Sequence, residues 1–481
     1  MPDRSVPDHT SQGPALGHTA ELADMLAGWL PKQRWFPGGG TALAELTVVS
    51  DVPLASGEPE LRHLVVQTMV AGQAARFQVL VGARHTPPRA LGGALIGERA
   101  GTSWYDALHD PDLAAMLLEG IGAERRAGPL RFIREPATDA VAAPVADDGW
   151  PDPAVSPGRV LTAEQSNTSL VFGDRAILKV LRRLFPGANP DLEVADALAR
   201  LGSRRVATPF GWIETDLEGE HVLLGVLSHY LAGATDGWSL ALSSLAQARP
   251  FTDQARLLGQ ATAELHADMA AAFGQRELNR DELAALAAAM QAKLTDAIAV
   301  VPQLASHGAK VSAVYEDVGR LPGPVLVQRI HGDYHLGQVL RSEQGWVALD
   351  FEGEPAMPLA QRRAMAPPLR DVAGMLRSFD YAARHQLTGQ PEASPPDAWV
   401  AQCQAAFLAG YATGGDAGPS GGAGPSVGTG LSADTGPAAG GAGQSTLLRA
   451  LTFEKAVYEV VYEYRHRPSW LPIPLDYLAG A

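Results

Sequence analysis

Two short segments in the last third of the chain carry residue types suited to moving a phosphoryl group. Residues 331–338 read His-Gly-Asp-Tyr-His-Leu-Gly-Gln, and residues 346–353 read Trp-Val-Ala-Leu-Asp-Phe-Glu-Gly. We interpret Asp333 as the base that accepts a proton from an attacking hydroxyl. Gln338 and Asp350 carry hard oxygen ligands of the kind that Mg²⁺ prefers.

A β-hairpin is expected to bring Gln338 and Asp350 together. Two apolar-rich runs, 338–341 and 346–349, flank the sequence Ser-Glu-Gln-Gly at 342–345, which is typical of a turn. Such a hairpin folds Asp350 back toward Gln338. Either aspartate alone could be an ordinary turn or cap residue, but the ordered set, with two glycines and two histidines interleaved, favours a site.

The two histidines of the first segment are not expected to form a zinc site. His331 and His335 lie four residues apart, but in a loop, with an aspartate between them and no glutamate after the first histidine. This pattern does not fit a zinc-binding helix. We expect His331 to brace the loop that carries Asp333.

A lysine within an apolar strand marks a candidate nucleotide site. Residues 169–172 and 176–180 are expected to form a hairpin with Lys179 in its second strand. A buried amine there needs a matching anion, although a lysine at a strand end can also reach solvent. Glu193, on a helix expected at 191–201, is a candidate partner, since protein kinases hold the α- and β-phosphates with a Lys–Glu pair.

The turn before this hairpin could cover phosphates with backbone and hydroxyl donors. Its residues are Gln165, Ser166, Asn167, Thr168 and Ser169. By itself this turn is a weak signal, because it lacks the glycines of the protein-kinase loop. A Walker-type loop is excluded, because the sequence contains no Gly-Lys dipeptide.

Charge and cysteine content narrow the class of protein. The formal net charge is −15, which argues against nucleic-acid and anionic-membrane partners, because both need Lys and Arg. The single cysteine, Cys403, cannot form an intrachain disulfide and is expected to be a buried helical residue. With no signal-peptide pattern and no long uncharged apolar stretch, we expect a cytoplasmic protein.

Hydrophobic periodicity predicts a mainly helical second half. In that half the helices are expected at 254–273, 280–300, 371–384, 396–412 and 446–466, and a further helix is expected at 104–120 in the first half. The last of these offers Lys455, Glu459, Tyr462 and Arg465, which are side chains of the kinds that hold sugars. Each of these four could equally be part of an ordinary amphipathic helix.

The motifs together resemble the aminoglycoside-phosphotransferase-like branch of the protein-kinase-like fold, and within it the actinobacterial maltokinases. The resemblance rests on segments 30–36, 164–169, 177–179, 234–238, 331–338, 350–355, 370–381, 454–463 and 467–475. It covers nearly the whole chain. One departure is Tyr464, where the family is expected to carry an alanine.

The resemblance implies an α+β, bilobal protein-kinase-like fold with an N-terminal β-rich cap domain and a mostly helical C-lobe. The expected parts are a disordered N-terminus at 1–20, the cap domain at 21–105, an intermediate and N-lobe nucleotide-binding domain at 106–230, the C-lobe at 231–481, and a disordered Gly-rich insertion at 414–445. The last assignment also follows from composition, since this segment can bury little apolar surface.

The resemblance also implies an activity. ATP and maltose would give maltose 1-phosphate and ADP, with Mg²⁺ as a further cofactor, and the product would feed glycogen synthesis. We expect a monomer that can associate with a trehalose synthase, and no nucleic-acid or membrane partner. Two alternatives remain: a kinase for another sugar such as glucosamine, and a non-catalytic kinase-like binding protein.

Overall fold

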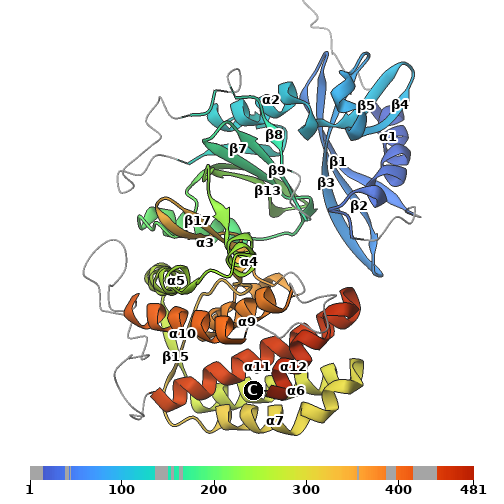
Figure 1. Ribbon diagram of the computed structural model, residues 1–481. Coiled ribbons are helices and arrows are strands. Elements are labelled where there is room, and N and C mark those ends of the chain that lie inside the picture. The colour runs from blue at the N-terminus through green and yellow to red at the C-terminus, as the bar shows by residue number, and fades with distance from the viewer. Residues whose placement is uncertain are drawn as a thin grey trace, which may run out of the picture. The chain divides into compact units, whose positions relative to one another are not determined.

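The computed structural model describes residues 15–37, 43, 45–135, 150–152, 156–161, 166–354, 357–385, 397–414 and 441–480. These residues form two compact units (Figure 1). The first unit holds the described residues up to 135, those within 150–189, and 209–230. The second holds 190–208 and 231–480. The predicted domain boundaries stay predictions, and most of the predicted disordered N-terminus lies outside the described residues.

The first unit begins with an antiparallel sheet covered by a helix. Helix α1 (Ala15–Trp29) starts inside the stretch that was expected to be disordered. The sheet has the order β1-β2-β3-β5-β4, with β11 also paired to β3. Its strands are β1 (Leu46–Ala55), β2 (Glu60–Val70), β3 (Gln73–Arg84), β4 (Leu95–Arg99), β5 (Thr102–Asp106) and β11 (Arg183–Leu184). One face packs on α1 through Leu22, Leu26 and Phe77.

A second sheet in the same unit carries the strands predicted to hold nucleotide. Among the described residues its order is β6-β7-β12-β13-β10-β9-β8. The strands are β6 (Arg126–Ala127), β7 (Leu130–Arg134), β8 (Arg159–Val160), β9 (Thr168–Phe172), β10 (Ala176–Val180), β12 (Pro209–Leu217) and β13 (Glu220–His229). The predicted hairpin at 169–180 is confirmed, because β9 and β10 pair antiparallel across a tight turn.

The helix predicted at 104–120 is wrong in its first half. Residues Thr102–Asp106 form β5, which pairs with β3 and β4 and buries Ser103 and Tyr105. Helix α2 (Pro111–Gly122) starts only after Asp110, whose side chain accepts from the Asp112 backbone amide and caps the helix. The apolar periodicity therefore predicted a real helix, but β5 and the Asp110 cap make this helix start later than expected.

The second unit is built from helices around one large core. They are α3 (Pro190–Arg200), α4 (Gly237–Ala246), α5 (Thr252–Phe273), α6 (Arg280–Val300), α7 (Ala305–Gly319), α8 (Leu359–Arg362), α9 (Leu369–His385), α10 (Asp397–Gly414), α11 (Gly441–His466) and α12 (Pro472–Gly480). Figure 1 shows α11 lying beside α6 and α7. The predicted helices at 254–273 and 280–300 are confirmed to within two residues.

Two glycines let α5 and α10 pack with their backbones close together. A Cβ atom at Gly259 would lie 2.0 Å from the Phe407 carbonyl oxygen, and one at Gly410 would lie 2.0 Å from that of Arg256. Cys403, on α10, is buried in this core as expected. Residues 414 and 441–445 are helical, so the predicted Gly-rich insertion is too long at both ends, and the rest of it lies outside the described residues.

A small sheet in the second unit carries the predicted catalytic hairpin. Its order is β14-β17-β18, with β14 at Thr235–Asp236, β17 at Val339–Ser342 and β18 at Gly345–Ala348. The hairpin prediction is confirmed by the pairing of Val339 with Ala348. A separate two-stranded sheet joins β15 (Gln275–Leu278) to β16 (Val325–Gln328), which leads into the loop that carries Asp333.

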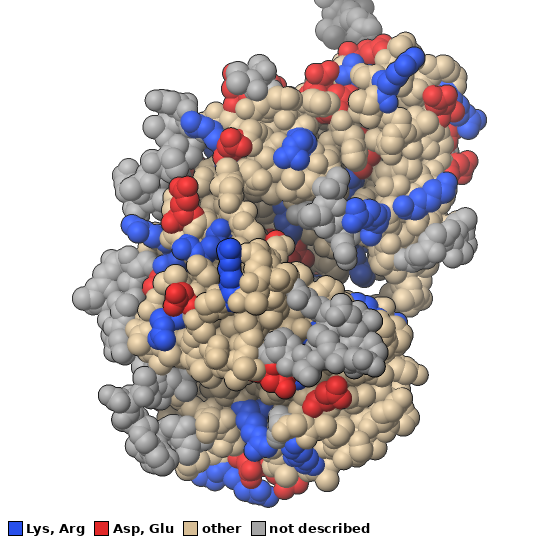
Figure 2. Space-filling model, viewed as in Figure 1, with Lys and Arg blue, Asp and Glu red and all other residues tan. Residues whose placement is uncertain are grey.

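One described helix, α6, is long and apolar enough to cross a membrane by length and composition alone. Its Lys293 forms a salt bridge of 2.7 Å with Glu454 on α11, and its Met290 is part of the helical core. About a quarter of its apolar window, 28%, is buried inside the structure, so α6 packs on the unit through one face. On the face shown in Figure 2, basic and acidic side chains are interspersed among the described residues.

Candidate active site

Asp333 lies in the loop between β16 and the 3₁₀ helix Leu336–Gln338, next to a lysine from α11. Lys455 Nζ donates to Asp333 Oδ1 at 3.2 Å, and His335 Nε2 lies 3.9 Å from Asp333 Oδ2. Burial opposes ionisation of the carboxyl, but the cation of Lys455, with smaller contributions from the two loop histidines, lowers its pKa below the ordinary value. Asp333 is therefore held ionised, as a general base must be.

His331 braces this loop, as the sequence predicted. Its Nε2 donates to the Leu349 carbonyl at 2.8 Å, which ties the loop to the end of β18. Its ring packs against Tyr334 and Phe351, with ring centroids 5.2 and 5.0 Å away. The side chain is almost fully buried. His331 thus links the loop to the segment that carries Asp350.

A buried carboxylate, Asp371 in the first turn of α9, anchors the same loop. Asp371 accepts hydrogen bonds from the backbone amides of His331 at 2.8 Å and Gly332 at 2.9 Å, and from His266 Nε2 at 3.1 Å. His266 in turn contacts the Tyr411 hydroxyl at 2.9 Å. Burial opposes the charge, yet these donors lower the pKa of Asp371.

Sequence reasoning gave Asp371 no role. The available signal was an acidic residue among apolar ones, at the start of a helix with a continuous buried face. A buried aspartate needs partners, and backbone amides of a preceding loop are common ones.

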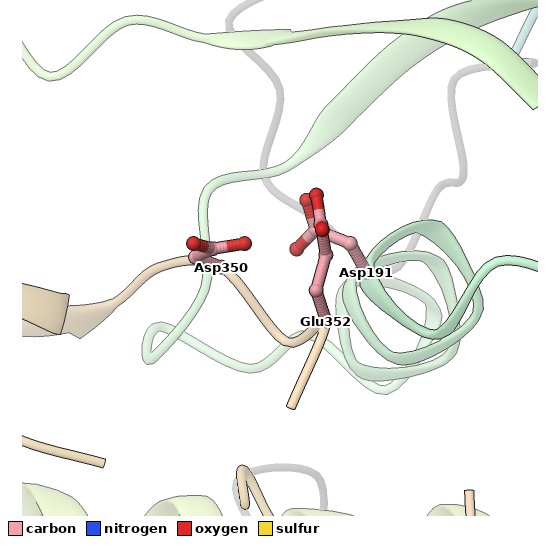
Figure 3. Close-up of side chains that lie close together, drawn as sticks. All are labelled: Asp191, Asp350 and Glu352. Carbon is pink, nitrogen blue, oxygen red and sulfur yellow. The ribbon is translucent and has the colours of Figure 1, made fainter. Parts of the chain in front are cut away.

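The two predicted metal ligands lie in contact. Gln338 Nε2 donates to Asp350 Oδ2 at 3.3 Å, because the hairpin folds Asp350 back onto Gln338. Two carboxylates that the sequence did not single out join them, Asp191 from α3 and Glu352. One oxygen from each of Asp191, Asp350 and Glu352 lies within 4.8 Å of the others (Figure 3).

This donor set fits a hard divalent cation. Carboxylate and amide oxygens are the ligands that Mg²⁺ prefers, and several anions close together favour a cation. Asp350 has a φ of 63°, a left-handed conformation that is uncommon for residues other than glycine. A strained backbone at a candidate ligand is consistent with a functional role.

Glu193 is occupied within its own unit. Its carboxylate accepts from Arg363 Nη2 at 2.6 Å and Nε at 3.1 Å, and Arg329 Nη2 lies 3.2 Å away. Lys179 belongs to the other unit, where it lies half-buried in β10 opposite Ser169 and Val226. The predicted Lys179–Glu193 pair therefore stays a prediction.

The predicted phosphate turn is held by a buried arginine. Arg182 Nε donates to Thr168 Oγ1 at 2.8 Å, and its backbone amide donates to Asn167 Oδ1 at 3.3 Å. The guanidinium also pairs with Asp106 and lies 4.7 Å from the centroid of the Trp35 ring.

The other residues of the turn differ in exposure. Ser169 is buried in β9, whereas Ser166 is exposed. Gln165 lies outside the described residues.

Of the four predicted sugar ligands, Lys455 is the one in contact with the catalytic loop. Glu459 is buried against Arg377, with 2.8 Å between carboxylate and guanidinium. Tyr462 is 39% exposed, and Arg465 is exposed.

Aromatic rings continue along α11 from Lys455. The ammonium of Lys455 lies 5.0 Å from the centroid of the Tyr458 ring, the Tyr458 and Tyr462 rings are stacked at 6.1 Å, and His466 follows at 4.8 Å. We call Tyr458, Tyr462 and His466 the aromatic strip.

Comparison with known proteins identifies the relatives of this chain. Residues 29–110 match the family model described as the maltokinase N-terminal cap domain. A glucosamine kinase from Streptacidiphilus jiangxiensis is 31% identical, over 66% of this chain and 71% of that protein. A glucosamine kinase from Mycolicibacterium smegmatis is 28% identical, over 76% and 92%.

A solved structure agrees over almost the full length. The structure described as glucosamine kinase in complex with glucosamine, ADP and inorganic phosphate is 26% identical, covers 95% of this chain and 98% of that one, and superposes with a TM-score of 0.63. The fold is therefore the predicted α+β kinase-like fold with an N-terminal cap domain. The chain belongs to the maltokinase-like family of aminoglycoside-phosphotransferase-type kinases.

Proposed function

We propose that the protein is an ATP-dependent sugar kinase that phosphorylates maltose at the anomeric hydroxyl. The observation that carries the proposal is the contact between Asp333 and Lys455, because it places the base beside the helix that bears the aromatic strip. Aromatic faces and charged side chains are the usual means of holding a sugar. A hydroxyl of a sugar bound there would lie within reach of the base.

The reaction needs one proton acceptor and a stabilised phosphoryl group. The sugar oxygen attacks the γ-phosphorus, Asp333 takes the hydroxyl proton, and the bond between the γ-phosphorus and the β-phosphate oxygen breaks to release ADP. Because Lys455 lowers the pKa of Asp333, the carboxylate is ready to accept that proton at neutral pH.

The remaining residues would bind the nucleotide and its metal. Gln338 and Asp350 would hold Mg²⁺, which would neutralise charge on the phosphates when bound. Lys179 would contact the α- and β-phosphates, and the turn at 165–169 would cover them with amide and hydroxyl donors. Glu193 is kept as the proposed partner of Lys179, by analogy with the Lys–Glu pair of protein kinases.

Glucosamine is the second candidate acceptor, since the relatives are named for it. A local feature also favours an amine. Burial opposes the charge of Lys455, yet the carboxylates of Asp333, Glu354 and Glu459 raise its pKa, so a cation is favoured at this place. Maltose is preferred because residues 29–110 match the maltokinase cap-domain model.

The test is an ADP-release assay with maltose, glucosamine, glucose and maltotriose, with the product identified by phosphorus NMR. Turnover with maltose and a phosphate on the anomeric carbon support the proposal, whereas turnover with glucosamine alone would replace maltose by the second candidate. Asp333→Asn should lower kcat by orders of magnitude with ADP affinity retained. ADP binding without turnover on any sugar would indicate a non-catalytic binding protein.

A further inference from the structure

The backbone of Asp350 is strained and is held on both sides. Its φ of 63° costs about 1 kcal/mol or more for a residue with a side chain, so neighbouring contacts must maintain it. On the preceding side, the Leu349 carbonyl accepts from His331 Nε2 at 2.8 Å, and the Leu349 amide donates to the Gln338 carbonyl at 2.9 Å. These bonds fix where the chain enters residue 350.

On the C-terminal side of Asp350, the backbone is held by the carboxylate of Asp191, which comes from a different part of the chain. The Phe351 backbone amide donates to Asp191 Oδ1 at 2.8 Å. Asp191 lies in the first turn of α3, where the helix dipole favours a negative charge. Phe351 itself is buried, with its ring against His331. The peptide that leaves residue 350 is therefore oriented by α3.

We infer that Asp191 is a positioning residue for Asp350. By accepting from the Phe351 amide it keeps residue 350 in the left-handed conformation, and this aims the Asp350 side chain at Gln338 and at the group shown in Figure 3. The inference rests on the proposed function, in which Asp350 binds the metal of the nucleotide complex. One Asp191 oxygen also belongs to the group in Figure 3, but we assign the main effect of this residue to the oxygen that accepts from the Phe351 amide.

If Asp191 acts as an acceptor, two substitutions at this position should have different effects on metal binding. Asp191→Asn keeps an oxygen that can accept from the Phe351 amide, whereas Asp191→Ala removes it. With Asp191→Ala, the residue after Asp350 loses its orientation, and the metal-dependent part of nucleotide affinity should fall about tenfold or more, as for other residues that orient metal ligands. With Asp191→Asn, the same quantity should stay within about threefold of wild type.

The experiment measures ADP binding by calorimetry, once with excess Mg²⁺ and once with a chelator, and takes the ratio of the two dissociation constants. This ratio reports the metal contribution and does not depend on turnover. The matched control is Asn279→Ala, which removes a side-chain acceptor from the start of α6, where Asn279 Oδ1 accepts from the Glu282 amide at 2.9 Å. The control should lower stability slightly and leave the ratio unchanged.

Equal loss of the ratio in Asp191→Asn and Asp191→Ala would overturn the inference, since the negative charge, and not the acceptor, would then matter. An unchanged ratio in folded Asp191→Ala would also overturn it. If Asp191→Ala does not fold, His331→Phe provides the second test, because it removes the bond to Leu349 but keeps an aromatic ring. His331→Phe should lower the ratio by a similar factor. An unchanged ratio in this variant would contradict the claim that contacts on both sides of Asp350 fix its backbone.

Failure of the proposed function would look different. In that case wild type would show no effect of Mg²⁺ on ADP affinity, or Asp350→Asn would leave the ratio unchanged. If wild type and Asp350→Asn behave as proposed while Asp191→Ala resembles wild type, only the inference about Asp191 fails.

Discussion

Asp371→Asn should detach the catalytic loop from α9. The two carboxylate oxygens of Asp371 serve different donors: Oδ1 accepts from the Gly332 amide, and Oδ2 from the His331 amide and His266. Asparagine retains one oxygen and places an amide NH₂ where the other was. His266 can adapt by changing its tautomer, but whichever way the asparagine is turned, one backbone amide, that of His331 or that of Gly332, faces a second donor.

The expected loss of stability follows from these contacts. A buried donor without an acceptor costs about 1–3 kcal/mol, and loss of the charge on the remaining bond removes about 1 kcal/mol more, so the free energy of unfolding should fall by about 2–4 kcal/mol. Because Asp333 follows the loosened segment directly, kcat should fall about 100-fold, the usual effect of a displacement of about 1 Å. ADP affinity should stay within about threefold.

Urea unfolding and steady-state kinetics measure both effects. Tyr411→Phe is the graded control, because it removes the hydroxyl that contacts His266 at 2.9 Å and leaves Asp371 intact. It should lower stability by about 1 kcal/mol and change kcat little. If Asp371→Asn loses less than about 1 kcal/mol, or keeps wild-type kcat, the loop is not anchored by this carboxylate.

Three further predictions follow from other contacts. Lys455→Met should shift the acid limb of the kcat/KM–pH profile to higher pH, because loss of the cation lets burial raise the pKa of Asp333; an unshifted limb would contradict this. In the first unit, burial lowers the pKa of His63 to about 4 from about 6.5, so the unfolding free energy should drop by up to about 3 kcal/mol as the pH falls between these values, and His63→Gln should flatten this slope in urea titrations. Arg182→Met should weaken ADP binding about tenfold by releasing the phosphate turn. Arg84→Met, which breaks an Arg–Asp pair elsewhere in the same unit, should leave ADP binding unchanged.

The catalytic hairpin could be predicted because its signals are local. Turn residues between two short apolar runs fix the register of β17 and β18, and the register alone brings Asp350 to Gln338. The bracing role of His331 was also predicted, from the absence of a zinc-binding pattern. The start of helix α2 was missed, because β5 and the Asp110 cap interrupt a periodicity that looked continuous.

Contacts between distant segments could not be derived from sequence. Asp191 reaches the Phe351 amide across 160 positions, and Asp371 reaches the catalytic loop across about 40. Both look like ordinary acidic residues in the first turn of a helix, where the dipole favours them. Glu459 was predicted as a sugar ligand from its place on a helix face, and this stays a prediction; its ion pair with Arg377 could not be derived from the sequence.

The left-handed backbone of Asp350 also limits how this position can change over generations. Asparagine and glycine are the other residues that adopt this conformation readily, and each is one nucleotide away from an aspartate codon. Either change keeps the hairpin intact but removes the negative charge. If Asp350 binds the metal as proposed, a single-nucleotide change at this codon can remove metal binding and leave the fold intact, whereas most other replacements would also disturb the chain.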